Sequence, residues 1–408
     1  MPLAEVKYQS HAQKLLQRAI TGQRLPHAYI FHGLEGIGKE MLARGLAQLL
    51  LCARPLERSL EGADAQTVGV DRLLDGCGDC TDCRAVAARS HPDLHLVYRQ
   101  LNREHPDPAI RRRKALELGV DVLRHFVIDR AGLTAVRGRA KVFIIREADR
   151  ATSAAQNALL KTLEEPPAGT HVVLLAATRD RLLPTTLSRC QVVRFDPLPT
   201  AFVRDKLGSL FPDMSAEQIS WYASCSQGSL GATLEHVGDR LYQVNHTLVG
   251  KLTELNGRTI DSVLSAWTDA SKTLGSGYRK RDPEISETEA VRRGFRTILQ
   301  LAAAYYADIL RSAAPTRSAE RPSVENAAPA APIAVSARAP AIINAAWEMH
   351  IRTAAQRTEA EHAVDAVNRI AQAEHQLDLN GNVQLVIETL AADLANLSAG
   401  VAVRAGVW

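Results

Sequence analysis

Short runs rich in β-branched and aromatic residues alternate with helical patterns through the first half of the chain. The runs are predicted strands, at residues 28–32, 94–97, 141–145, 171–177 and 192–195. Parallel strands need a crossover connection, so strands that alternate with helices are typical of a parallel sheet covered by helices. The first half of the chain therefore predicts an α/β domain.

The pattern changes after Phe195, where Pro197-Leu198-Pro199 predicts a stiff connector to a purely helical region. We expect an α/β domain over residues 1–196, a small helical domain over 197–240 and an all-helical domain over 241–408. Two polar stretches interrupt the last of these, at residues 269–289 and 313–340. Both are predicted to be flexible loops, and the second, rich in Ala, Pro, Ser and Arg, is predicted to be disordered.

The first predicted strand runs directly into the glycine-rich loop Gly33-Leu34-Glu35-Gly36-Ile37-Gly38-Lys39-Glu40, and an apolar helix follows. This context is that of the P-loop, G-x-x-x-x-G-K-[ST], in which backbone amides and the lysine hold phosphate and the last hydroxyl binds magnesium. Gly33, Gly36, Gly38 and Lys39 are the candidate phosphate ligands. Glu40 replaces the hydroxyl and would place a carboxylate beside the phosphates, so we predict that the loop is not used for hydrolysis.

A second departure lies at the end of the third predicted strand, where a P-loop ATPase needs one acid for magnesium and one for the attacking water. The chain reads Ile145-Arg146-Glu147, with an arginine in place of the metal-binding acid. Two contacts to the same ion are missing, so we predict no magnesium site and no intrinsic ATPase. Two alternatives stay open: nucleotide binding without turnover through Lys39, and a loop that only connects strand to helix.

Four of the six cysteines lie close together in the sequence: Cys52, Cys77, Cys80 and Cys83. The first residues lack a signal-peptide pattern and no run of about 18 apolar residues occurs, so we expect a cytoplasmic protein without a membrane segment. Clustered cysteines in that compartment favour metal over disulfides. Four thiolates suit a closed structural zinc site within a module at about residues 52–90. The alternative is four reduced thiols, and Cys52, separated from Cys77 by 24 residues, is the least certain ligand.

Net charge adds little to this picture. The chain has 49 basic and 45 acidic residues among 408, a formal net charge of +4. A balance this close to neutral does not by itself predict nucleic-acid binding. Any contact with DNA would be local or shared with partner proteins.

Together with the P-loop and the cysteines, several further runs resemble the clamp-loader branch of the AAA+ ATPases, and within it the delta-prime subunits of bacterial DNA polymerase III. They occur in family order over about residues 8–240: Leu25-Pro26-His27-Ala28-Tyr29, Leu50-Leu51-Cys52, His91-Pro92-Asp93, the run from Gln156 to Pro167, and the run from Leu182 to Cys190. The ATP-hydrolysing gamma/tau subunits would keep a Ser or Thr at position 40 and an acid at position 146. Gly231 also stands where active relatives carry a nucleotide-sensing arginine.

The resemblance implies a P-loop-type AAA+ domain with a parallel sheet, a helical lid and a helical collar that joins the subunits of the loader. It implies that Ser188-Arg189-Cys190 carries an arginine finger, with Arg189 completing the ATP site of a neighbouring subunit, and that the four clustered cysteines bind zinc. The alternative for Arg189 is a surface arginine that pairs with an acid of its own domain.

The implied partners are the gamma/tau and delta subunits and, through the complex, the sliding clamp and primed DNA. The implied setting is DNA replication by a DNA-directed DNA polymerase, a nucleotidyltransferase, to which this chain would contribute without hydrolysing ATP itself. Two alternative functions stay open. One is an ATP-hydrolysing motor subunit of the gamma/tau type, and the other is a non-replicative AAA+ scaffold or adaptor.

Overall fold

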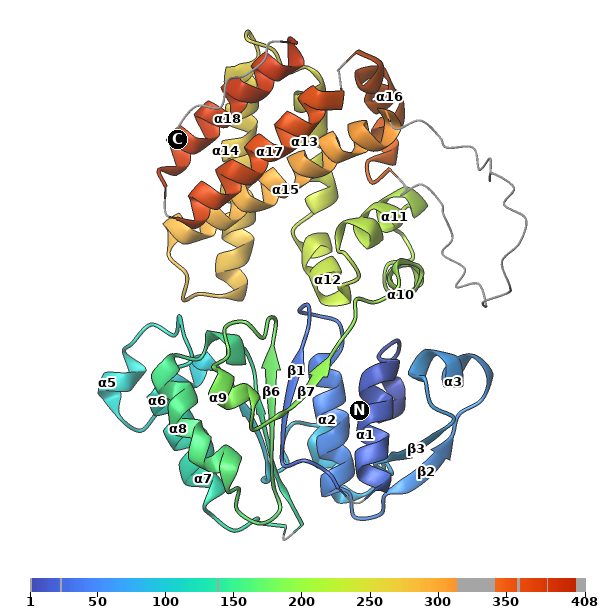
Figure 1. Cartoon of the computed structure of the whole chain (residues 1–408), viewed down its shortest axis with the longest axis vertical. Coiled ribbons are helices and arrows are strands. Elements are labelled where there is room, and N and C mark those ends of the chain that lie inside the picture. The colour runs from blue at the N-terminus through green and yellow to red at the C-terminus, as the bar shows by residue number, and fades with distance from the viewer. Residues whose placement is uncertain are drawn as a thin grey trace, which may run out of the picture. The chain divides into compact units, whose positions relative to one another are not determined.

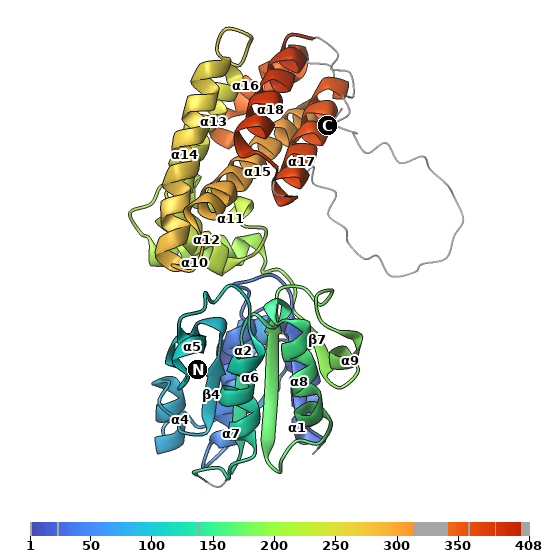
Figure 2. The same ribbon diagram turned by 90° about the vertical axis from the view of Figure 1, so that its left-hand side faces the viewer.

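The structure is a computed structural model that describes residues 2–22, 24–137, 139–313, 342–357, 360–379 and 381–400 (Figures 1 and 2). The chain divides into two compact units, one of residues 1–206 with 226–233 and one of residues 207–225 with 234–408. The domain boundaries expected near residues 196 and 240 stay predictions. The disorder predicted for residues 313–340 falls outside the described residues, apart from Ala313.

The first unit is built on a five-stranded parallel sheet with the strand order β4-β5-β6-β1-β7. The strands are β1 (Ala28–His32), β4 (Leu94–Val97), β5 (Lys141–Ile145), β6 (Thr170–Ala176) and β7 (Gln191–Arg194). In the register of the central strands, Ile30 lies between Leu174 and Val192. The predicted parallel α/β fold is confirmed.

Helices cover both faces of this sheet, which explains why its strands are almost continuously apolar. All five residues of β5 are buried. Helices α1 (Ser10–Thr21) and α2 (Lys39–Leu51) lie on one face. Helices α6 (Val120–Leu123), α7 (Asp129–Ala131) and α8 (Ser153–Glu164) lie on the other (Figure 1). Two further short helices, α5 (Pro108–Arg111) and α9 (Pro184–Leu187), also belong to this part of the chain.

Helix α8 follows the spacing of its sequence. Ala155, Leu159 and Leu163 recur every four residues and are all buried in the core between α8 and the sheet. The helix begins where the Thr152 hydroxyl accepts a hydrogen bond from the Ala155 amide at 3.2 Å, and it ends before Pro166-Pro167. Its position is therefore fixed at both ends and along one face.

A small module interrupts the α/β pattern between α2 and β4. It contains the antiparallel strands β2 (Leu56–Ser59) and β3 (Arg72–Asp75) and the helices α3 (Gly62–Val68) and α4 (Thr81–Ala87). The hairpin was not predicted, because each strand has only four residues and charged side chains occupy several of them. Asp75 of β3 is fully buried and accepts a hydrogen bond from the Leu3 amide at 3.0 Å, which ties the module to the start of the chain.

The described part of the chain after β7 is helical, as predicted. Its helices are α10 (Thr200–Leu210), α11 (Ala216–Cys225), α12 (Leu230–Gly238), α13 (Leu241–Thr253), α14 (Ile260–Arg281), α15 (Glu287–Ala313), α16 (Glu348–Arg357), α17 (Ala360–Asp378) and α18 (Val383–Ser398). Across the residues that the structure describes, no helix combines the length and the apolarity needed to cross a membrane.

The flexible loop predicted at residues 269–289 is wrong. Helix α14 continues through Arg281 and α15 begins at Glu287, so only a short turn separates them. Glycines at the contact of α14 with α15 allow close packing: a Cβ on Gly275 would lie 3.1 Å from the Ala290 backbone, and one on Gly294 would overlap the Ser271 carbonyl oxygen. Small residues at a helix contact let two backbones approach, and sequence alone does not separate this use from a loop.

Candidate functional site

The three glycines of the phosphate loop have left-handed backbone conformations. Their φ angles are +142° at Gly33, +72° at Gly36 and +104° at Gly38, immediately before α2 begins at Lys39. A Cβ on Gly33 would lie 2.6 Å from the carbonyl oxygen of Phe195. The backbone therefore requires glycine in this loop whether or not a nucleotide binds there.

Lys39, the residue that would reach the phosphates, points into its own loop. Its ammonium donates to the carbonyl oxygens of Gly33 and of Leu34, the latter at 2.6 Å, and the residue is only 8% exposed. Burial lowers the pKa of Lys39 to about 8, against the opposing effect of Glu35 and Asp149. A phosphate would have to draw this ammonium away from two carbonyl groups.

A second segment of the first unit, residues 226–233, lies against the loop. The Gly231 amide donates to the Gly36 carbonyl at 3.1 Å, and the Ser229 hydroxyl donates to the Glu35 carbonyl at 2.6 Å. A Cβ on Gly231 would lie 2.6 Å from the Cα of Gly36, so no other residue fits there without displacing the loop. Gly231 is also the position at which the resemblance implies an arginine in active relatives.

The two positions that depart from the ATPase pattern bind each other. Arg146 donates from Nε and Nη2 to the two carboxylate oxygens of Glu40, at 2.8 and 2.7 Å. Arg44 Nε lies 3.0 Å from the same carboxylate, and the Arg146 guanidinium lies 5.9 Å from the centre of the Tyr98 ring. A bidentate ion pair is the strongest arrangement that these two side chains can form. The sequence presented them as two separate losses, because they lie 106 residues apart.

Glu147, the remaining acid of the pair expected after β5, is engaged as well. It has a left-handed backbone, with φ of +51°, and its carboxylate accepts two hydrogen bonds from Arg99 Nε at 3.0 and 3.1 Å. Arg150 donates to it at 3.1 Å. Neither Glu40 nor Glu147 is thus an uncommitted carboxylate of the kind that a magnesium ion would need.

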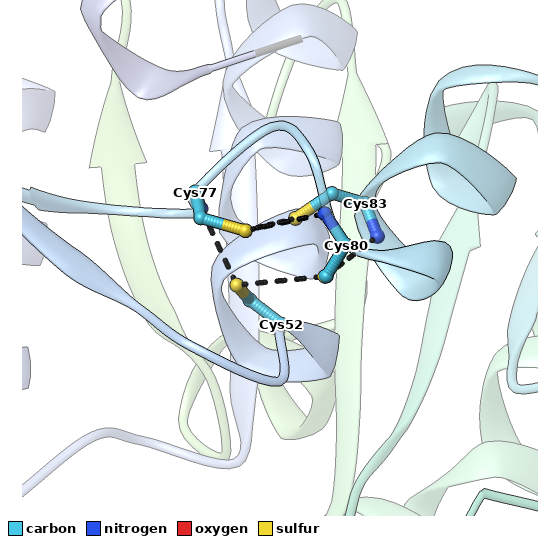
Figure 3. A group of neighbouring side chains, drawn as sticks. All are labelled: Cys52, Cys77, Cys80 and Cys83. Atoms are coloured by element: carbon cyan, nitrogen blue, oxygen red, sulfur yellow. Dashed lines mark hydrogen bonds between the residues drawn. The ribbon is translucent and has the colours of Figure 1, made fainter.

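The four clustered cysteines converge at the junction of α2 and α4 (Figure 3). Their sulfur atoms all lie within 4.8 Å of one another. Cys52 directly follows α2, Cys80 precedes α4 and Cys83 lies in its first turn, so the cluster joins two helix ends. The structure brings Cys52 beside the others in spite of its distance in sequence.

This donor set fits a zinc ion. Four thiolates at about 2.3 Å from a tetrahedral metal lie about 3.8 Å apart, and the Cys52–Cys80 and Cys77–Cys83 sulfurs are 4.0 and 3.9 Å apart. These separations exclude a disulfide, which needs about 2.05 Å. Burial opposes ionisation of Cys80, but hydrogen bonds from the Cys83 and Ala53 amides and from the Cys83 and Cys77 thiols outweigh it and lower the pKa of this thiol to about 6. Amide donors also lower the pKa of Cys77, whereas burial raises the pKa of Cys52 and, to about 12, that of Cys83. Amide donors thus favour the thiolate, the form that binds metal, at two of the four sulfurs.

Arg189 lies between α9 and β7. Cys190 packs against the core of the first unit, and burial raises its pKa to about 12. The Arg189 side chain is 31% exposed; Nε and Nη2 contact the carboxylate of Glu164, and Nη1 donates to the Thr185 carbonyl at 2.9 Å. Arg189 therefore has an acidic partner in its own domain, the arrangement that the alternative for this residue describes.

Gln156 holds the segment that leads to Arg189, a role that sequence reasoning missed. Its Oε1 accepts from the Leu183 amide at 2.8 Å, and its Nε2 donates to the carbonyl oxygens of Ala151 and Arg181 at 3.1 and 3.2 Å. The spacing in the sequence could have indicated this role, since an amide three residues before Leu159 falls on the buried face of α8. A buried amide needs partners, and two of the three partners here, Arg181 and Leu183, are backbone groups of the segment that leads into α9.

The family model described as "DNA polymerase III, delta subunit" matches residues 8–199. The delta-prime subunit of Bacillus subtilis DNA polymerase III is 33% identical over 199 residues, which cover 49% of this chain and 51% of that protein. The delta-prime subunit of Pseudomonas aeruginosa is 37% identical over 207 residues, covering 50% of this chain and 53% of that one. The first half of this chain is similar to delta-prime subunits of DNA polymerase III. The resemblance that the sequence motifs suggested is thus confirmed over that half.

This chain is also similar to gamma/tau subunits of DNA polymerase III. The gamma/tau subunit of Mycobacterium tuberculosis is 34% identical over 209 residues, which cover 51% of this chain and 31% of that protein. The chain spans about half the length of the delta-prime relatives that it matches. This chain is thus similar to both kinds of subunit. The residues at the phosphate loop and at the end of β5 must distinguish between them.

Proposed function

We propose that this chain is a non-hydrolysing delta-prime subunit that helps a clamp loader place the sliding clamp on primed DNA during replication in the cytoplasm. The Glu40–Arg146 ion pair carries this proposal. It joins the two positions at which an ATPase would bind magnesium, so the carboxylate is neutralised and a guanidinium lies beside it. An ATPase would need both positions to contact the metal that bridges the phosphates.

Arg189 would contribute to catalysis in trans, at the ATP site of a neighbouring subunit. An arginine finger stabilises the charge that spreads over the transferring phosphoryl group, and such residues raise the rate by about 10³- to 10⁵-fold. The placement of Arg189 supports this role: Gln156 and the half-buried Cys190 hold the backbone on either side, while the guanidinium remains partly exposed. The expected recipient is ATP bound by an adjacent gamma/tau subunit.

We further propose that Cys52, Cys77, Cys80 and Cys83 hold a structural zinc ion. A closed four-thiolate site leaves no open coordination position, so zinc here would supply stability and no catalysis. By joining the end of α2 to the start of α4, the four residues would fix the module beside the helix that begins at the phosphate loop.

The two alternative functions make different predictions. The bonds of Lys39 and the contact of Gly231 with Gly36 count against a gamma/tau-type motor. One observation favours the non-replicative adaptor, namely that Arg189 is already paired with Glu164. That pair is exposed, and exposed pairs contribute only about 0–1 kcal/mol, so it is compatible with a finger that engages a second anion.

Two measurements on the purified full-length chain test the proposal. Titration with a fluorescent ATP analogue and magnesium should give no saturable binding, and a pull-down with the gamma/tau and delta subunits should recover a stable complex. Saturable binding followed by hydrolysis, abolished by Lys39→Met, would establish the motor subunit instead. A chain that forms no complex with either partner would be an adaptor of another kind.

A further inference from the structure

We propose that Glu164 is a competing anion for Arg189. In the free subunit the Glu164 carboxylate holds the guanidinium, and the terminal phosphate of a nucleotide bound by the neighbouring subunit takes its place in the assembled complex. The inference rests on the proposed function of Arg189 in trans and adds a second residue to it. Glu164 would be a positioning residue, since it acts through Arg189 and does not itself contact the nucleotide.

The geometry shows which part of Arg189 is occupied. Nε and Nη2 both contact Glu164, and they form the side of the guanidinium that binds an anion bidentately. Nη1 donates to the Thr185 carbonyl and lies 3.4 Å from the Ser188 hydroxyl. All three nitrogens therefore have partners within this chain. A phosphate that used the bidentate side would have to displace Glu164.

The exchange is feasible because the pair is exposed. The Glu164 side chain is 46% exposed and that of Arg189 is 31% exposed. Exposed pairs bind weakly, shifting an equilibrium by at most about fivefold. A terminal phosphate carries more charge than one carboxylate and would meet Arg189 in an interface that excludes water, where the attraction is stronger. Glu164 can thus hold the guanidinium before assembly without preventing its transfer.

Glu164 is well placed to present this carboxylate. It is the last residue of α8, the helix whose Gln156 also binds the segment leading to Arg189. The negative end of the helix dipole lies there and adds to the attraction for a cation. Both ends of α8 therefore contact the finger segment, one through the buried Gln156 and one through the exposed Glu164.

The test is steady-state ATP turnover by the complex reconstituted with gamma/tau and delta, measured over a range of ATP concentrations. Glu164→Gln keeps the size and an acceptor but removes the charge. It should lower the ATP concentration for half-maximal turnover by about two- to fivefold, the range open to an exposed pair, with maximal turnover unchanged. Glu164→Asp keeps the charge and should behave as the unaltered chain. Glu165→Gln is the matched control at the adjacent exposed position.

The outcomes separate this inference from the function on which it rests. If Arg189→Ala lowers turnover but Glu164→Gln changes nothing, the finger stands and the competing role of Glu164 is overturned. A Glu164→Gln complex that loses maximal turnover at an unchanged half-maximal concentration would also contradict competition. If Arg189→Ala itself leaves turnover unchanged, the proposed role of Arg189 is contradicted, and so is the inference that rests on it.

Discussion

Two arginine–glutamate pairs in the first unit can be compared directly. Arg146 and Glu40 lie beside the phosphate loop, where Arg44 and the Tyr98 ring also contact them. Arg189 and Glu164 lie at the tip of α8, and no second cation and no ring is recorded at that pair among the described residues. The two arginines are similarly exposed, at 35% and 31%, so the pairs differ in their surroundings. The first pair has further partners in the chain's own site, whereas the second has a more exposed carboxylate and can exchange partners.

The two pairs should therefore affect different properties: the first pair the stability of the chain, and the second the ATP turnover of the assembled loader. Residues around the phosphate loop bind one another, so changing them should affect folding and leave ATP turnover by an assembled loader nearly unaltered. Changing Arg189 should lower ATP turnover by the assembled loader and leave folding nearly unaltered.

Removing a cysteine ligand should have the largest effect. Cys83→Ser should release zinc and lower the free energy of unfolding by about 3–5 kcal/mol, because a metal that binds only the folded chain contributes its binding energy to folding. Native mass spectrometry should find one zinc ion in the unaltered chain and none in the variant. If the unaltered chain carries no zinc and the variant is no less stable, a structural zinc site is contradicted.

Filling the contact between Gly231 and Gly36 should come next. Gly231→Ala places a Cβ 2.6 Å from the Gly36 Cα and should lower the free energy of unfolding by about 1–3 kcal/mol. Gly257→Ala is the matched control, because nothing lies within 4 Å of a Cβ at that position. Urea denaturation followed by circular dichroism measures both. Equal stability of the two variants would mean that the loop is not held by this contact.

The Glu40–Arg146 pair should make a smaller contribution. A double-mutant cycle with Glu40→Ala and Arg146→Ala should give a coupling of about 0.5–1 kcal/mol, since both side chains are about one third exposed. The same variants should leave ATP turnover by the complex unchanged. Additive effects on stability would show that the two side chains do not act as a pair in solution.

Arg189→Ala should have the smallest effect on stability. The isolated chain should unfold within about 0.5 kcal/mol of the unaltered chain, as expected for an exposed ion pair. Differential scanning calorimetry of the two chains measures this. A large loss of stability would make Arg189 a structural residue and would weaken the contrast with the phosphate loop.

The sequence predicted the sheet well, because its strands are continuous apolar runs bounded by turns. The second half of α14, from residue 269 to Arg281, was missed, since its polar residues resemble a loop until α15 is seen packed against them. The two departures at Glu40 and Arg146 were identified, but their pairing was not, because no local pattern links residues so far apart in the chain. Glu164 was likewise overlooked, since an exposed acid at a helix end has no distinguishing signal of its own.

The central claim is that the chemistry this chain supports takes place in a neighbour's site. The most direct test compares ATP turnover by complexes that contain Lys39→Met or Arg189→Ala, with assembly verified by gel filtration. Lys39→Met should leave turnover unchanged, whereas Arg189→Ala should remove turnover at the adjacent site, where a finger contributes about 10³-fold or more. Loss of turnover with Lys39→Met and none with Arg189→Ala would contradict the account.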